Sequence, residues 1–213
     1  MSPPLSASDP AAVSASVAAS VTAAVSAPVT TPGAAPAHAH GAAPSSAEAD
    51  APTAAELLDF VRRAAADKEL IATLPLDPEG RTWLRLEGPG GSEAWLIGWA
   101  PGTGTGWHDH AESLGAFATA EGELTEHSLA VRLPASGWKT LELNEGVDRE
   151  RRLGAGRSRA FGKHHVHEVL NESDTEHAVS VHAYYPPLPL LRRFSRSGAV
   201  LRLEHVERPE DWQ

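Results

Sequence analysis

The chain has 213 residues, enough for one ordinary domain and a tail. Its formal net charge is −10 and it has no basic stripe, which argues against nucleic-acid and anionic-membrane partners. It contains no cysteine, so disulfides and thiolate metal ligands are excluded and a metal would be bound by histidine, carboxylate or water.

The N-terminal segment differs in composition from the rest of the chain. Residues 1–51 contain no Lys, Arg, Phe, Tyr or Trp and are rich in Ala, Ser, Pro, Val and Thr. Such a segment cannot bury enough apolar surface to offset its ordering entropy, so we expect a disordered tail over 1–51 and a folded domain over 52–213. The tail lacks a positive n-region and a compact apolar run, and no stretch approaches the roughly 20 apolar residues of a membrane span. We therefore expect a cytoplasmic protein, and a monomer.

The domain is expected to open with a helix and to continue as short strands. Thr53 and Glu56 match a capping box, and apolar residues at helical spacing follow as far as residues 67–69. Gly- and Pro-containing breakers then separate eight expected strands, which predict a mainly β sandwich or small barrel. The strands are Thr82–Glu87, Glu93–Trp99, Gly115–Ala120, Glu123–His127, Lys139–Leu143, His165–Asn171, Ala178–Tyr184 and Val200–Val206.

A pair of histidines is the strongest chemical signal. His108 and His110 are two residues apart, so on a strand both rings point to the same face and can share one metal ion. A third histidine from a distant strand would complete a facial set of neutral nitrogen ligands and leave coordination positions open. Imidazole suits iron, zinc, copper and nickel, so the set alone does not identify the metal.

The motifs resemble those of the cupin superfamily, whose fold is a small β-barrel of the jelly-roll type. The first motif is Gly102-x5-His108-x-His110, and the second is Gly156-x5-Gly162 with His167-x3-Asn171. Within the cupins, Ser180-x-His182-x-Tyr184-Tyr185-Pro186-Pro187 resembles cysteine dioxygenase and its thiol dioxygenase relatives. The similarity extends over about residues 81–188.

The resemblance implies an Fe(II) cofactor bound by His108, His110 and His167. His165 is the alternative third ligand because it has the same strand parity as His167. The carboxylate that typical cupins carry after the histidine pair is missing. Gly115 stands where animal cysteine dioxygenases have a cysteine cross-linked to the active-site tyrosine, so no cross-link is possible.

The resemblance also implies catalytic roles for Ser180, His182 and Tyr184. They would form a hydrogen-bond relay that places the Tyr184 hydroxyl near a small thiol substrate and O2. The alternative for Tyr184 is a core tyrosine satisfied by an internal hydrogen bond. The implied reaction adds both atoms of O2 to the sulfur of L-cysteine and yields cysteine sulfinic acid.

Arg85 is the expected substrate-binding residue. In the family an arginine upstream of the histidine pair clamps the substrate carboxylate, and Trp83-Leu84-Arg85 matches its aromatic-x-Arg pattern. The alignment requires a gap within residues 88–92, so Arg81 is a rival, and a surface salt bridge is the alternative role of Arg85.

Two other functions remain open. The same fold could serve a dioxygenase for another small thiol, such as 3-mercaptopropionate, or a non-catalytic cupin that binds a metal or a small acid. A cluster of five arginines is interpreted as a solvated face or loop: Arg149, Arg151, Arg152, Arg157 and Arg159.

Overall fold

The computed structural model describes residues 51–134 and 137–211. The expected tail over 1–51 lies outside these residues, apart from Ala51, so the tail and the domain boundary stay predictions. The described residues contain the α-helices α2 (Ala54–Ala66) and α3 (Lys68–Ile71), and 3₁₀ turns at Pro89–Gly91 and Pro209–Asp211. They also contain twelve strands in two antiparallel sheets.

The first sheet has five strands and the second has seven. The spatial order of the first sheet is β1 (Arg81–Glu87), β2 (Glu93–Trp99), β10 (Ala178–Tyr185), β4 (Leu114–Glu121), β8 (Ser158–Phe161). That of the second is β6 (Thr140–Glu142), β12 (Val200–Glu207), β11 (Leu191–Ser197), β3 (His108–Asp109), β9 (His167–Leu170), β5 (Glu123–Leu129), β7 (Asp148–Gly154). Within the described residues the two sheets do not close into a continuous barrel, and the expected mainly β, cupin-type jelly roll is confirmed.

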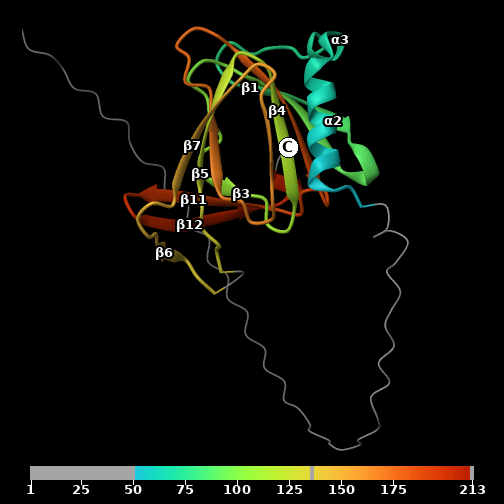
Figure 1. Cartoon of the computed structure of the whole chain (residues 1–213). Helices are drawn as coiled ribbons and strands as arrows, with labels where there is room; N and C mark the ends of the chain where they lie inside the picture. The colour runs from blue at the N-terminus through green and yellow to red at the C-terminus, as the bar shows by residue number, and fades with distance from the viewer. Residues whose placement is uncertain (1–50, 135–136, 212–213) are drawn as a thin grey trace, which may run out of the picture. The chain divides into compact units, whose positions relative to one another are not determined.

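The first sheet is covered on both faces, and this sets the direction of its side chains. Helix α2 lies along the outside of this sheet beside β4 (Figure 1). Leu57 and Val61 of the helix pack in one cluster with Ala116 of β4 and Val181 of β10. Because strand side chains alternate between faces, Ser180, His182 and Tyr184 of β10 point away from the helix, toward the second sheet.

The helix begins as its sequence predicts. The Thr53 hydroxyl accepts a hydrogen bond from the Glu56 backbone N–H at 3.2 Å, and the Glu56 carboxylate accepts one from the Thr53 N–H at 2.7 Å. This is the expected capping box. The helix ends at Ala66, where Asp67 caps the short α3 through hydrogen bonds to two backbone N–H groups.

All eight expected strands are present, with ends shifted by a few residues. Four further strands were not expected: β3, β7, β8 and β11. The first five residues of β7 are all exposed, so this strand has no alternation of apolar and polar residues. It is an edge strand that forms because its backbone pairs with β5. Such pairing depends on a neighbouring strand and leaves no local pattern.

Gly115 occupies a place where a side chain would not fit. A Cβ atom there would lie 2.6 Å from Cζ of Phe161 and 2.9 Å from Cδ1 of Tyr184. Phe161 is the residue opposite Gly115 in the β4–β8 register. The phenylalanine ring therefore fills the space beside Tyr184 that a longer residue at position 115 would need.

We expect Gly115→Ala to lower the free energy of unfolding by about 1–3 kcal/mol, the usual cost of overpacking. Chemical denaturation measures this change. Gly162→Ala is the matched control, since its Cβ would have no heavy atom within 4 Å. Gly115→Ala should lower the free energy of unfolding by less when it is introduced into the Phe161→Leu variant, because the smaller side chain leaves room for the added Cβ. Equal effects of the two glycine substitutions would contradict the prediction.

Candidate metal centre and its cavity

Three histidines from two parts of the chain meet between the sheets. His108 of β3 is paired with His167 of β9, and His110 follows β3 directly. One ring nitrogen of each of the three lies within 4.8 Å of the others. All three side chains are buried. The structure thus brings together the three residues expected to bind the metal.

The unpaired ring nitrogens fit a metal ion. The Nδ1 atoms of His108 and His167 are engaged by the Gly106 carbonyl at 2.9 Å and the Glu126 carboxylate at 3.0 Å. Nε2 of His167 and Nδ1 of His110 are buried without a hydrogen-bond partner. Buried polar atoms left unpaired cost free energy, which a bound cation would recover.

The rings are held in the form that binds metals. Burial, followed by the neighbouring His167, keeps the pKa of His108 well below its usual value. Burial and the other histidines do the same to the pKa of His110. Both rings are therefore neutral near pH 7 and keep a lone pair for a metal.

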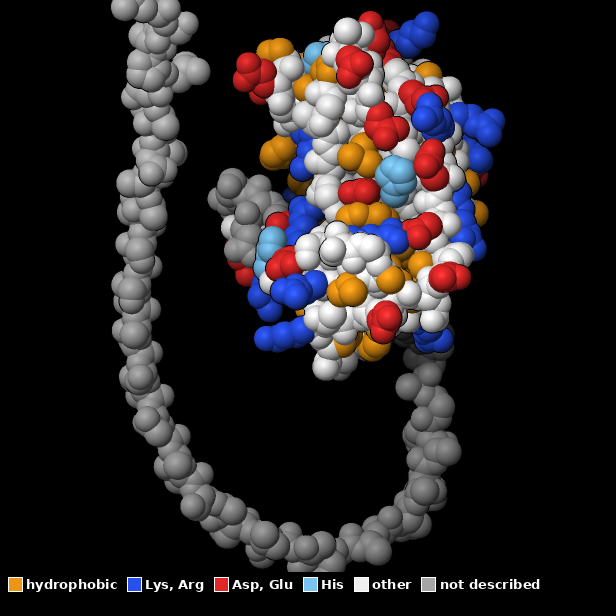
Figure 2. Space-filling view, turned by 90° about the vertical axis from the view of Figure 1, so that its left-hand side faces the viewer, with side chains coloured by type: hydrophobic (Ala, Val, Ile, Leu, Met, Phe, Trp, Pro, Cys, Tyr) orange, Lys and Arg blue, Asp and Glu red, His pale blue; other side chains and the backbone are white. Residues whose placement is uncertain are grey.

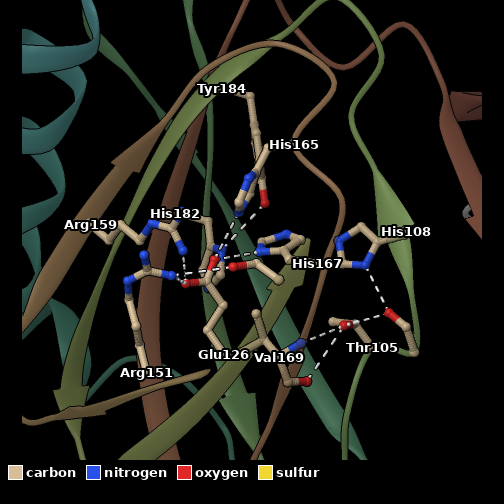
Figure 3. A network of polar contacts seen from close by, with 12 residues as sticks. Thr105, His108, Glu126, Arg151, Arg159, His165, His167, Val169, His182 and Tyr184 are labelled. Atoms are coloured by element: carbon tan, nitrogen blue, oxygen red, sulfur yellow. Dashed lines mark hydrogen bonds and ion pairs between the residues drawn. The ribbon is translucent and has the colours of Figure 1, made fainter. Parts of the chain in front are cut away.

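Glu126 orients this centre, although it is not among the residues predicted from the sequence. Its carboxylate is fully buried and accepts hydrogen bonds from His165 and His167, both at 3.0 Å (Figure 3). Arg159 contacts the same carboxylate, and Arg151 lies 3.7 Å from it. The strand alternation was a usable signal, because Glu126 shares the inward face of β5 with the buried Leu124.

The charge balance around Glu126 corrects the interpretation of one member of the arginine cluster, Arg159, while Arg149, Arg151, Arg152 and Arg157 are exposed as expected. Arg159 has a side chain only 20% exposed, and it neutralises Glu126 instead of facing solvent. Burial alone would raise the pKa of Glu126, but hydrogen bonds from the two histidines and the Arg159 charge lower it well below its usual range. Glu126 is therefore an anion that accepts from Nδ1–H of His167 and fixes which nitrogen of that ring is free.

The neighbouring histidines have separate roles. His165 was the alternative ligand, but its Nε2 is bound to Glu126. Glu126, His165 and His167 also lie close enough to hold a metal ion, yet they already hydrogen-bond to one another. His164 contacts Glu112 at 2.8 Å and so links the segment that follows β3 to the segment that precedes β9.

The predicted relay residues form a continuous chain of contacts. The Ser180 hydroxyl lies 2.9 Å from Nε2 of His182, and Nδ1 of His182 lies 3.3 Å from the Tyr184 hydroxyl. Trp99 extends the chain, since its indole N–H donates to Ser180 at 2.8 Å. Burial lowers the pKa of His182 to about 3 and, together with Glu93, raises that of Tyr184. The imidazole is therefore neutral and the phenol protonated near pH 7.

These groups border a cavity of about 420 Å³ between the sheets. The cavity is lined by the three metal-centre histidines and by His182 and Tyr184 of the relay. Its remaining walls include three tryptophans and three charged residues: Trp83, Trp95, Trp99, Arg81, Arg193 and Glu207. Neither Arg193 nor Glu207 was identified from the sequence.

The structure does not bring Arg85 into this cavity. Its side chain is 68% exposed and lies 3.9 Å from Glu93, which is the surface salt-bridge alternative considered for it. Arg81 lines the cavity with its guanidinium 5.5 Å from the Trp99 ring centre. The two arginines share one face of β1, but they are four positions apart, which corresponds to about 13 Å along the strand.

The sequence matches a known family over most of this domain. A family model described as "Cysteine dioxygenase type I" matches residues 40–197. The chain belongs to this family. Cysteine dioxygenase type 1 of Bos taurus is 29% identical to it, and that of Homo sapiens 30%, each over 112 residues. The chain spans about half the length of these curated relatives, since the match covers 52% of each protein.

Similar solved structures are more distant. The protein TT1209 from Thermus thermophilus is 20% identical, with a TM-score of 0.41, over 57% of this chain and 98% of that chain.

The surface of this cysteine dioxygenase family member is mixed in charge. On the face that Figure 2 shows, acidic and basic side chains are interspersed. Over residues 51–134 and 137–211, every helix is too short or too polar to cross a membrane.

We expect Glu126→Gln to weaken metal binding by about 10- to 100-fold, because it removes the anion that orients His167 and raises its basicity. The apparent affinity is measured by Fe(II) or Co(II) titration of protein that circular dichroism shows to be folded. Glu123→Gln, which changes an exposed carboxylate of the same strand, is the matched control. An unchanged affinity in folded Glu126→Gln protein would refute the role of Glu126.

Proposed function

We propose that the protein is an Fe(II)-dependent thiol dioxygenase that acts on L-cysteine. The overall reaction joins one thiol and one O2 and gives the sulfinic acid, so both oxygen atoms end on sulfur and the thiol hydrogen becomes the acid proton. One observation carries the proposal: three buried imidazoles meet at a cavity that also contains Arg81 and Tyr184.

His108, His110 and His167 would hold the iron through the ring nitrogens that face one another. When bound, Fe(II) supplies positive charge that favours the thiolate form of the substrate and redox activity toward O2. Glu126 keeps His167 in the tautomer that leaves Nε2 available.

Arg81 would bind the substrate carboxylate. Its guanidinium is planar and offers paired N–H donors, which match the two oxygens of a carboxylate. Packing against Trp99 restricts the side chain before substrate arrives, so less conformational entropy is lost on binding. The role first expected of Arg85 therefore passes to Arg81 in this proposal.

The relay would present a proton to the cavity. Trp99 donates to Ser180, so the Ser180 hydroxyl can donate to Nε2 of His182. The neutral His182 then carries its proton on Nδ1 and donates it to the Tyr184 oxygen. The Tyr184 hydrogen is left to donate to an oxygen atom of the reacting group in the cavity.

Oxygen uptake by the Fe(II)-loaded protein tests the activity. We expect uptake with L-cysteine, formation of the sulfinic acid, and loss of both in His110→Ala. His177→Ala, which changes a partly exposed histidine outside the cavity, should retain activity. Uptake with 3-mercaptopropionate alone would retain the mechanism and reject cysteine as substrate. An iron-replete protein without uptake on either thiol would favour a binding cupin.

A pair of substitutions on β1 decides which arginine binds the carboxylate. We expect Arg81→Gln to lower kcat/KM for cysteine about ten- to a hundredfold, mainly through KM, because a charge-assisted hydrogen bond contributes about 1.5–3 kcal/mol. Arg85→Gln is the matched control on the same strand face, and its kcat/KM should stay near that of the unmodified protein. If Arg85→Gln lowers kcat/KM and Arg81→Gln does not, the substrate carboxylate is bound by Arg85.

A further inference from the structure

A second charged pair lines the same cavity. Arg193 of β11 and Glu207 at the end of β12 both border it. Arg193 lies opposite His108 in the β3–β11 register, so it is carried on the strand next to a metal-centre histidine. Arg81 lines the same cavity, so its wall contains two guanidinium groups and one carboxylate.

The pair has a defined geometry. Nε and Nη2 of Arg193 contact one oxygen of Glu207 at 2.9 and 2.8 Å, and Nη1 donates to the Thr105 carbonyl at 3.1 Å. The two side chains are only 22% and 24% exposed. The interaction is therefore less screened than a surface ion pair, and it holds the Arg193 guanidinium on Glu207.

The three charges influence one another. Burial has the largest effect on the pKa of Arg81 and lowers it, and the positive charge of Arg193 lowers it further. The negative charge of Glu207 raises it. Because Glu207 neutralises Arg193, Arg81 is the one guanidinium of the cavity wall whose charge is left for a ligand, beside the metal centre. A thiol with one carboxylate matches this charge when it pairs with Arg81. A thiol with two carboxylates would bring its second anion beside Glu207, where the guanidinium of Arg193 is already paired.

We infer that Glu207 determines substrate specificity: by occupying Arg193 it restricts the cavity to thiols with one carboxylate and excludes those with two. This rests on the proposed thiol dioxygenase activity and assigns its substrate class. Glu207 acts partly by repulsion of the second anion and partly by withholding Arg193. Removing its charge alone should therefore open a second anion site next to the first.

The test compares mercaptosuccinate, which has two carboxylates, with 3-mercaptopropionate, which has one. In Glu207→Gln we expect the ratio of kcat/KM for the first thiol to that for the second to rise at least about tenfold. Arg193→Gln should lower the ratio, because Glu207 then loses the guanidinium that neutralises it and keeps only its contact with the exposed His205. The double variant should lose the gain of Glu207→Gln. Glu204→Gln, an exposed residue of the same strand, is the matched control.

Equilibrium binding separates this inference from the proposed activity. Trp83, Trp95 and Trp99 line the cavity, so quenching of tryptophan fluorescence by the two thiols reports binding in the anaerobic, iron-loaded protein. If no thiol is oxidised but the ratio of dissociation constants shifts in Glu207→Gln, the activity is wrong and the role of Glu207 holds. An unchanged ratio in folded Glu207→Gln, or equal changes for both thiols, would overturn the inference. Arg193→Gln decides the question if Glu207→Gln does not fold.

Discussion

The buried carboxylate of Glu126 is the interaction on which the rest of the centre depends. A buried anion is costly unless cations and hydrogen-bond donors surround it, and here they come from three other strands or their flanking loops. Arg151 and Arg159 supply positive charge on one side, and His165 and His167 donate on the other (Figure 3). The same contacts that make the burial of Glu126 tolerable also orient His167, so fold stability and ligand geometry are coupled.

The sheet beside helix α2 separates packing from chemistry. Val181 and Ala183 of β10 pack toward the helix. Ser180, His182 and Tyr184 point to the other face, where His182 and Tyr184 line the cavity. A single strand can therefore secure the helix and carry the relay, because its side chains alternate between two buried faces. This explains why nearly every residue of β10 is buried.

Recognition groups come from strands other than the one that carries the relay. Arg81 lies on β1, and Arg193 and Glu207 lie on β11 and β12, at opposite ends of the order of strands along the chain. The cavity joins them because both sheets contribute to its walls. In the proposed enzyme the charges that select a substrate can thus be substituted without changing the strand that carries the relay.

The sequence by itself determined what local periodicity encodes. The capping box predicted the start of α2, and a spacing of two residues predicted that His108 and His110, and likewise Ser180, His182 and Tyr184, face one way. Only the tertiary structure decided that Arg81 instead of Arg85 borders the cavity, since both have the same strand parity. It also decided the partners of Glu126 and the pairing of Arg193 with Glu207. These contacts depend on which strands become neighbours, and residues that meet across a sandwich leave no mark in the local pattern of either strand.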